Sequence, residues 1–413
     1  MPRSNTHPYL LILAAVPLLG LNCLGTIPGT GFPKSVDWTR RTVNMGAAVR
    51  PSVVATSDLD MDGRLDVIGG YPGTDSTTAV VYVFFQETVD NFTAVLIATT
   101  TNLTGLSALV VGDLDGDTHL DIVAACNGRL VYLHSAVDPR DPAGWTQSSI
   151  DGSTGGAEIA QWNDVVIGNI DGANGPDIVA CNGGTPGRVS WFRSPSAGIT
   201  TGTGWTRIEI DMAERTGASS VALADFSGDG RFDVVSTAQG ESTERIAWYQ
   251  NPTDPVAGAW AKHAVGNLTS ATRVEIADLD ADGRNDVIGL NGPGRQIGWY
   301  MRPADATTAW SGFLLTQYTS NTPVDVKATD INADGQIDVV AATRTAGSLR
   351  WFIPNPGDTQ TAQWLENNIR DVTETIGRIA LGDIDGDGRP DVVAPLLGAT
   401  TAADSIAWFE NPE

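Results

Sequence analysis

Short runs that alternate apolar and polar residues recur along the whole chain. The run SVALADF begins at Ser220 and places Val221 and Leu223 on one face, and the β-branched run DVVST follows from Asp233. Alternation with a period of two is typical of β-strands, and the runs show no helical period. The pattern therefore predicts an all-β protein.

Four such runs make one unit. The second run ends in a turn that is often Asn-Gly, as at Asn127-Gly128, which is the strongest short hairpin signal. The third run ends in an aromatic pair and often Asn-Pro, as in AWYQNP from Ala247, and the fourth opens on tryptophan, as in WTRIEI from Trp205. Each unit is predicted to form four short antiparallel strands.

The unit occurs seven times at a mean spacing of about 54 residues. Seven four-stranded units predict a seven-bladed β-propeller, which closes on itself and leaves no long bare sheet edge. A fourth-type strand, DWTRRTV from Asp37, precedes the first unit, and the chain stops after a third-type strand, IAWFENPE. We expect this N-terminal strand to complete and close the last blade.

The first 25 residues resemble a secretion signal. Arg3 supplies a positive charge, and the apolar run from Leu10 to Leu21 is too short to span a bilayer comfortably. We predict a signal at 1–25, a linker at 26–35 and the propeller at 36–413, in a protein that is secreted, periplasmic or held at the cell surface. Cys23 is either a lipid attachment site or a residue near the cut of a plain signal.

One acidic phrase, D-x-D-x-D-G-x-x-D, joins the first and second runs of each unit. Positions 1, 3, 5 and 9 offer side-chain oxygens, and position 7 can offer its backbone carbonyl. Hard oxygen ligands without histidine or cysteine favour Ca²⁺. An EF-hand is excluded, because position 12 of the first copy is Gly69 and strands flank the loop.

The seven copies predict up to seven calcium sites. The candidate ligands are Asp58, Asp60, Asp62, Arg64 and Asp66; Asp113, Asp115, Asp117, His119 and Asp121; Asn169, Asp171 and Asp177; Asp225, Ser227, Asp229, Arg231 and Asp233; Asp278, Asp280, Asp282, Arg284 and Asp286; Asp330, Asn332, Asp334, Gln336 and Asp338; and Asp383, Asp385, Asp387, Arg389 and Asp391. Arg64 and the other position-7 residues would act through their carbonyls. Thr118 replaces the glycine of position 6, at a cost of about 1 kcal/mol in backbone strain. The third copy, with Ala173 at position 5, is expected to bind most weakly.

These phrases resemble the FG-GAP/VCBS repeat family, whose seven-bladed propellers include the head of integrin α subunits. The resemblance covers roughly residues 36–413, and the poorly kept Phe-Gly and Gly-Ala-Pro signatures make the bacterial VCBS version the closer likeness. It implies that each loop binds Ca²⁺ on the lower face of the propeller, and it supports a role in adhesion.

The net charge of the chain serves only to argue against certain classes of partner. The formal net charge is −24, which argues against nucleic acid or an anionic membrane as a partner. The loop copies hold 24 carboxylates, as many as the net charge, so the acidity is mostly that of the predicted metal sites. Cys126 and Cys181 follow similar strands in neighbouring units and are either a disulfide or two free buried thiols.

A ligand site is expected on the face opposite the loops. Trp162 alone departs from the tryptophan pattern and is either a sugar-stacking indole or one more packing residue. The predicted inner strands also carry charged residues, which either recognise a polar ligand or pair across blades: Asp164, Arg273, Glu275, Asp325, Lys327 and Arg378. We expect a monomeric, exported, non-catalytic propeller that binds carbohydrate or protein, with a polysaccharide-acting enzyme, or an accessory domain of one, as the alternative.

Overall fold

The computed structural model describes residues 38–412 except for short internal stretches. These stretches are 46–49, 73–78, 101–104, 136, 152–160, 185–186, 197–198, 200–202, 213–216, 242–243, 345, 355–363 and 401–402. The predicted signal at 1–25, the linker at 26–35 and Cys23 lie outside the described residues.

The described strands form seven antiparallel sheets, which we call blades 1 to 7 in chain order. Blade 1 contains β2 (Val53–Ser57), β3 (Asp66–Tyr71), β4 (Ala79–Thr88) and β5 (Asn91–Thr100); blade 2 contains β6 (Ala108–Gly112), β7 (Asp121–Cys126), β8 (Arg129–His134) and β9 (Thr146–Ser149); blade 3 contains β10 (Trp162–Gly168), β11 (Asp177–Asn182), β12 (Arg188–Arg193) and β13 (Thr206–Asp211). Blade 4 contains β14 (Ala218–Ala224), β15 (Asp233–Ala238), β16 (Ile246–Gln250) and β17 (Ala261–Gly266); blade 5 contains β18 (Arg273–Ala277), β19 (Asp286–Asn291), β20 (Gln296–Met301) and β21 (Ser311–Gln317); blade 6 contains β22 (Pro323–Thr329), β23 (Asp338–Thr343), β24 (Ser348–Pro354) and β25 (Trp364–Asp371). Blade 7 contains β26 (Thr375–Ile376), β27 (Ala380–Gly382), β28 (Asp391–Leu397), β29 (Ser405–Glu410) and β1 (Thr39–Met45).

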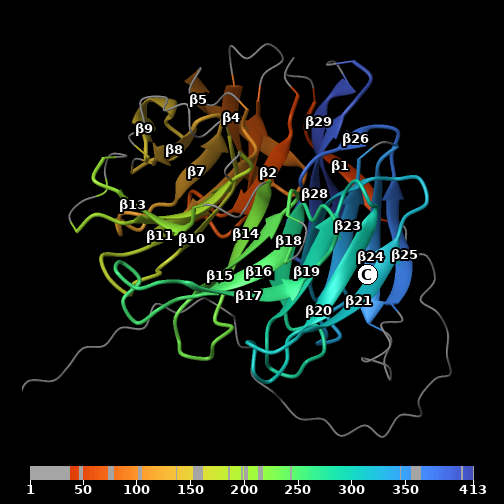
Figure 1. The fold of residues 1–413 in the computed structure, drawn as a ribbon. Coiled ribbons are helices and arrows are strands. Elements are labelled where there is room, and N and C mark those ends of the chain that lie inside the picture. Colours follow the sequence, from red (N-terminus) through yellow and green to blue (C-terminus); the bar gives the residue numbers. More distant parts are fainter. Residues whose placement is uncertain are drawn as a thin grey trace, which may run out of the picture. The chain divides into compact units, whose positions relative to one another are not determined.

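The ring is closed by both ends of the propeller, as Figure 1 shows where β1 lies beside β29. Arg41 of β1 pairs with Trp408 of β29, so the N-terminal strand supplies the outer strand of blade 7. On the inner side, the Arg378 N–H donates to the Ser52 carbonyl at 3.1 Å, which joins blade 7 to blade 1. The predicted seven-bladed ring and its closure are confirmed.

The core lies between adjacent blades. All six residues of each second strand are buried in blades 1 to 6, because neighbouring sheets cover both of its faces. The third-strand tryptophans fill the space between blades; Trp191, Trp248 and Trp408 have no exposed surface. Such burial contributes about 2–3 kcal/mol per large apolar side chain.

Two smaller expectations are settled by the described residues. Cys126 and Cys181 are both buried free thiols, which decides against the disulfide. Apart from a short 3₁₀ turn, η2 (Pro142–Gly144), the described elements are strands, and no described helix is long and apolar enough to cross a membrane.

Candidate functional site

Six of the seven acidic loops fold around the carboxylate of their first residue, and in the third the amide oxygen of Asn169 accepts the N–H of Gly172 at 2.7 Å. In blade 1 the two oxygens of Asp58 accept the N–H groups of Asp62 at 3.0 Å and Gly63 at 2.9 Å. The same contacts recur in blade 7, where Asp383 accepts the N–H of Gly388 at 2.8 Å. Hydrogen bonds to its own carboxylate oxygens therefore hold the loop closed.

The backbone follows the same path in all seven loops. Positions 4 and 6 are left-handed in every copy: Met61 and Gly63, Gly116 and Thr118, Gly172 and Asn174, Gly228 and Gly230, Ala281 and Gly283, Ala333 and Gly335, and Gly386 and Gly388. Thr118 adopts φ 78°, so the strain expected at this residue is present. A Cβ added to Gly63 would meet no atom within 4 Å, so the backbone conformation, not space, selects glycine there.

The left-handed residue at position 4 was not foreseen. Met61 and Ala281 hold φ values of 58° and 59° without a glycine to mark them. The glycines at this position in the second, third, fourth and seventh copies were the available signal.

The ninth-position aspartates are buried and act as staples. One oxygen of Asp391 accepts the N–H of Ile384 at 2.8 Å, inside the loop. The other accepts the N–H of Asn411 at 2.7 Å, at the end of the third strand. Burial raises the pKa of Asp391 to about 7, against the lowering effect of these two donors. The hydrogen bond from the N–H of loop position 2 to the ninth-position aspartate recurs in all seven blades.

Blade 6 departs from this arrangement. Pro354 lies three residues after Trp351, as Asn411 lies three residues after Trp408, so it occupies the donor's position. Proline has no N–H. One carboxylate oxygen of Asp338 is consequently buried without a hydrogen-bond partner among the described residues.

The residue that donates its N–H to the ninth aspartate often also reaches the previous blade, and we call it the clasp residue. In four blades its side chain donates to the carbonyl of position 2 in the preceding loop: Gln86 to Ile384 at 2.8 Å, Asn251 to Ile170 at 2.8 Å, Arg302 to Phe226 at 2.6 Å and Asn411 to Ile331 at 2.7 Å. Loop conformation is thereby coupled to the contact between blades.

Several loops gather acidic oxygens closely enough to hold a metal ion. Groups with oxygens within 4.8 Å of one another form in the first, second, fifth and seventh copies: Asp58, Asp60 and Asp62; Asp113, Asp115 and Asp121; Asp278, Asp280 and Asp282; and Asp383, Asp385 and Asp391. Asp115 and Asp117 also form such a group with His134. In the other three copies an amide, a hydroxyl or alanine replaces one or two of the acids.

Cationic side chains contact these acids. Arg64 pairs with Asp62 in its own loop, and the same pairing recurs at positions 5 and 7 of the fourth, fifth and seventh copies. Arg140 of blade 2 reaches Asp60 of blade 1 at 2.6 Å, and in the third copy Arg193 holds Asp171 at 2.5 Å. The loops thus hold carboxylates that attract positive charge.

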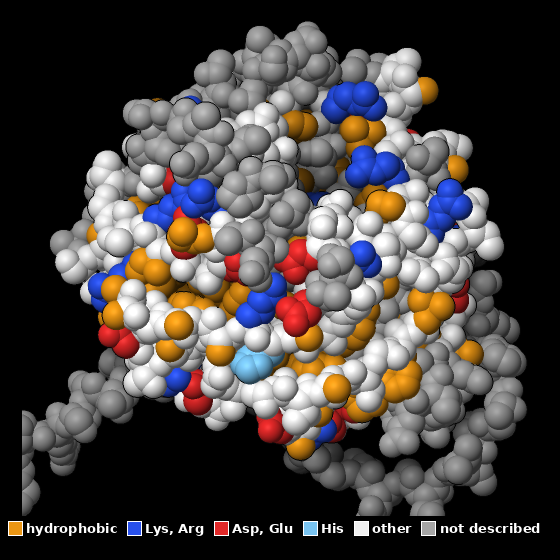
Figure 2. All heavy atoms as spheres, in the orientation of Figure 1, with side chains coloured by type: hydrophobic (Ala, Val, Ile, Leu, Met, Phe, Trp, Pro, Cys, Tyr) orange, Lys and Arg blue, Asp and Glu red, His pale blue; other side chains and the backbone are white. Residues whose placement is uncertain are grey.

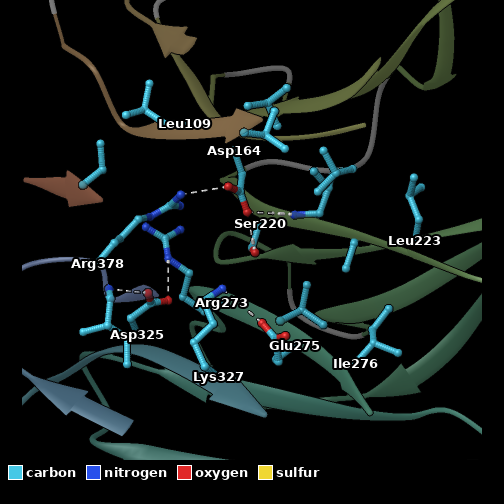
Figure 3. Close-up of a pocket in the computed structure, with 18 of the residues that line it drawn as sticks. Leu109, Asp164, Ser220, Leu223, Arg273, Glu275, Ile276, Asp325, Lys327 and Arg378 are labelled. Carbon is cyan, nitrogen blue, oxygen red and sulfur yellow. Dashed lines mark hydrogen bonds and ion pairs between the residues drawn. The ribbon is translucent and has the colours of Figure 1, made fainter. Parts of the chain in front are cut away.

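The predicted inner-strand charges converge on the central channel (Figure 3), a cavity of about 450 Å³. They pair across blades: Arg378 with Asp164 at 2.8 Å, Lys327 with Glu275 at 3.3 Å and Arg273 with Asp325 at 4.0 Å. Ser220 also donates to Asp164 at 2.7 Å, and the Ile379 N–H donates to Asp325 at 2.9 Å. The pairing alternative therefore describes this channel.

Burial and neighbouring charges shift the channel groups in opposite directions. Burial raises the pKa of Glu275, and the nearby Lys327 only partly offsets it. For Asp164 burial acts in the same direction, but Arg378 and Arg273 outweigh it and lower its pKa overall. Burial and the charge of Arg378 lower the pKa of Arg273 to about 10. Burial and the charges across the channel together therefore set the direction of each of these shifts.

Of the two alternatives for Trp162, the structure supports the packing residue and contradicts the exposed, sugar-stacking indole. Its side chain is 0% exposed, packed edge-on against Phe192 and beneath the guanidinium of Arg207. Trp162 begins β10 facing the core between blades, so it packs like the other tryptophans and offers no surface to a sugar.

Two adjoining hollows open at the end of the channel away from the acidic loops. Their volumes are about 360 and 480 Å³, and both are lined by Ser107, Arg273, Val324 and Arg344. These residues lie at the starts of inner strands or the ends of second strands, whereas the loops connect the opposite ends. Sequence reasoning missed Arg344, which follows a second strand and belongs to no repeated motif.

The surface carries both signs of charge. Figure 2 shows Lys and Arg side chains close to Asp and Glu side chains near the centre of the face in view. Hydrophobic side chains lie among them, so the visible face is mixed.

Two solved structures with the same fold are distant in sequence. A chain of the crystal structure of BBS1N in complex with ARL6DN is 12% identical, with a TM-score of 0.53, over 91% of this chain and 99% of that one. A lectin of Agrocybe aegerita that recognises non-reducing terminal N-acetylglucosamine is 14% identical, with a TM-score of 0.53, over 78% of this chain and 81% of that one. A search of curated proteins finds no match.

The family comparison agrees with the repeats. The model of the FG-GAP-like repeat matches residues 41–124, 161–236 and 330–394, which together make up more than half of the chain. These segments contain six of the seven acidic loops, all except the fifth at 278–286. The chain belongs to the family of FG-GAP-like repeat proteins.

Proposed function

We propose that this protein is an exported, calcium-stabilised recognition propeller that binds a carbohydrate without transforming it. The observation that carries the proposal is that the two ends of the inner strands carry different groups. Acidic loops of one backbone shape occupy one end, and a polar hollow occupies the other.

Calcium fits the loops because each loop offers several hard oxygen ligands, which this ion prefers. Carboxylates at positions 1, 3 and 5 and the carbonyl of position 7 would hold the ion, with position 9 available in the second and seventh copies, where its oxygen joins the acidic group. A bound ion would neutralise the repulsion among the carboxylates. One oxygen of Asp338, which has no hydrogen-bond partner among the described residues, offers the sixth loop a further ligand atom.

The loops are not equivalent in this proposal. The third loop has Ala173 at position 5, and Arg193 already neutralises Asp171. It would therefore bind calcium most weakly of the seven. The loops with three or four acids would fill first, because each added carboxylate strengthens the attraction for a divalent ion.

Recognition is assigned to the hollows because they combine concave shape with polar lining. Gln161, Asn163, Thr272 and Gln239 line the smaller hollow and can exchange hydrogen bonds with hydroxyl groups. The lectin with this fold supports a carbohydrate ligand by analogy of fold alone. The paired charges of the channel support binding over turnover, since each described acid there has a cationic partner.

Export and monomeric action complete the proposal. The apolar run Leu10–Leu21 would direct secretion, and Cys23 would serve either as a lipid anchor or as a residue near the cut.

A glycan array with the full mature chain, with and without CaCl₂, tests the function, and chromatography of each bound glycan tests turnover. Binding without product supports the proposal. Release of product supports the enzyme alternative, and absence of any glycan binding in calcium rejects recognition of carbohydrate.

A further inference from the structure

The hollows at the mouth of the channel are cationic in a strongly acidic protein. The chain has 49 acidic and 25 basic residues. The larger hollow is nevertheless lined by Arg50, Arg273, Arg344 and Arg378, and the smaller by Arg273 and Arg344. No aspartate or glutamate of the described part of the chain lines either one.

The two outer arginines are exposed at the mouth. Arg344 is exposed and makes no side-chain ion pair with any residue that the structure describes. Arg50 reaches its one described acidic neighbour, Asp404, only at 3.8 Å and stays 47% exposed. Both guanidinium groups can therefore meet a ligand without first breaking a strong contact.

The two inner arginines form the floor of the larger hollow. Arg378 is fixed by Asp164, and Arg273 donates to the Ser219 carbonyl at 2.8 Å. The Nε atoms of both arginines are buried and make no hydrogen bond among the described residues. The floor is thus held in place by these contacts; Arg273 Nε lies 4.0 Å from Asp325, whereas Arg378 Nε keeps a donor that no described residue accepts.

The polar neighbours offer mainly acceptors. Asn163 donates its amide to the Ala218 carbonyl at 2.7 Å, which leaves its side-chain oxygen for a ligand. Ser107 and Thr272 donate their hydroxyls to the carbonyls of Trp162 at 2.6 Å and Leu290 at 3.1 Å. Their oxygen lone pairs remain able to accept hydrogen bonds from ligand hydroxyls.

A ligand that fits these groups must carry both a negative charge and several hydroxyl donors. Arginine favours carboxylate, because its planar fork matches the two oxygens. A bare inorganic anion would leave the acceptors unused, and a neutral sugar would leave the arginines unpaired. Resting on the proposed function, we infer that the mouth of the channel binds a uronic acid unit of an acidic polysaccharide, with Arg344 and Arg50 contacting its carboxylate.

The test is calorimetric titration of the full mature chain, in CaCl₂, with uronate trimers. The panel contains trimers of galacturonate, glucuronate, mannuronate and guluronate, each beside its carboxyl-reduced neutral counterpart, and sodium sulfate. The variant is Arg344→Ala. The matched control is Arg370→Ala, because Arg370 is an exposed arginine of the outer strand β25 and lines neither hollow. Melting temperatures confirm that both variants fold.

We expect at least one uronate trimer to bind at least about tenfold more tightly than its neutral counterpart. Arg344→Ala should lose about tenfold in affinity and Arg370→Ala none. Raising NaCl from about 50 mM to about 500 mM should weaken the binding, since the exposed arginines are screened. Sulfate should compete only weakly.

Other outcomes overturn the inference and leave the proposed function separately testable. Equal affinity for uronate and neutral trimers, equal affinity for sulfate, or no loss in Arg344→Ala contradicts a uronate site. If the glycan array still reports a neutral ligand, recognition of carbohydrate stands while this inference fails. If no sugar of either kind binds, both fail together.

Discussion

The side-chain amide of Asn411 donates to the carbonyl of Ile331 in the neighbouring blade at 2.7 Å. The backbone N–H of the same residue donates to Asp391 at 2.7 Å. One asparagine thus joins the buried acid of the seventh loop to the backbone of the sixth. Loop shape and packing between blades depend on each other through this contact.

Removal of this clasp should destabilise the ring. Asn411→Ala leaves the buried Ile331 carbonyl without its side-chain donor, which costs about 1–3 kcal/mol in the free energy of unfolding. Ser194 occupies the same position in blade 3, and its side chain makes no hydrogen bond to another blade within the described residues. Ser194→Ala should therefore change the stability by less than about 0.5 kcal/mol in urea unfolding. Equal losses in the two variants would contradict the clasp.

A single added acid should strengthen the sixth loop toward calcium. Asn332 stands at position 3, where its amide donates to Asp334 at 3.0 Å. Asn332→Asp replaces this contact with repulsion, so the variant should melt below the parent protein without calcium. With calcium the order should reverse, because the ion gains a carboxylate. Differential scanning calorimetry without and with calcium measures whether the variant melts below or above the parent protein in each condition.

A matched control uses the same chemical change elsewhere in the blade. Asn321→Asp lies before β22, at the end away from the loop. This variant should show no calcium-dependent change of sign. A shift of the same sign in both conditions for Asn332→Asp would count against calcium at this loop.

Backbone strain at position 6 should be removable. Thr118 holds φ 78°, and Thr118→Gly should raise the free energy of unfolding by about 0.5–1 kcal/mol after the greater freedom of glycine in the unfolded chain is included. The converse change, Gly63→Ala at φ 89°, should cost about 1 kcal/mol although the added Cβ meets no atom within 4 Å. Urea unfolding in calcium measures both. A stable Gly63→Ala protein would show that the left-handed loop is not required.

The stabilising effect of calcium should grow with pH. Burial is the largest cause that raises the pKa of Asp66 and of Asp391 to about 7. A carboxyl with a raised pKa favours the folded state below its unfolded value near 4, and this contribution is lost as the pH rises through 7. Calcium favours the ionised form of these carboxyl groups. Its binding must therefore displace protons at pH 5, where the groups are largely protonated, and few protons at pH 8. The gain in melting temperature on adding CaCl₂ to dialysed protein should be larger at pH 8, and a larger gain at pH 5 would contradict this linkage.

The sequence was sufficient for the fold because the repeated features are local. Asp58 and its six equivalents mark the same turn in each blade, and the fourth-type strand after Asp37 already indicated how the ring closes. The Asn-Pro pairs, such as Asn411-Pro412, were visible too, but their role in joining blades required the register of the third strand against the preceding loop.

The candidate ligand site could not be read in the same way. Trp162 departs from the repeat in sequence, yet its strand turns the indole into the core between blades. Arg50, Arg273 and Arg344 belong to different blades and to no common motif, and only ring closure brings them to one cavity. Charge pairing in the channel likewise depends on the order of blades in space.

The most direct test of the central claim is the melting temperature of the dialysed mature chain as a function of calcium concentration. Ions that bind the folded loops stabilise them by mass action, by about 2.7 kcal/mol per site at one hundred times the dissociation constant. The account predicts that the melting temperature rises steadily with CaCl₂ and rises much less with MgCl₂, which demands stricter octahedral geometry. An unchanged melting temperature across the calcium series would contradict it.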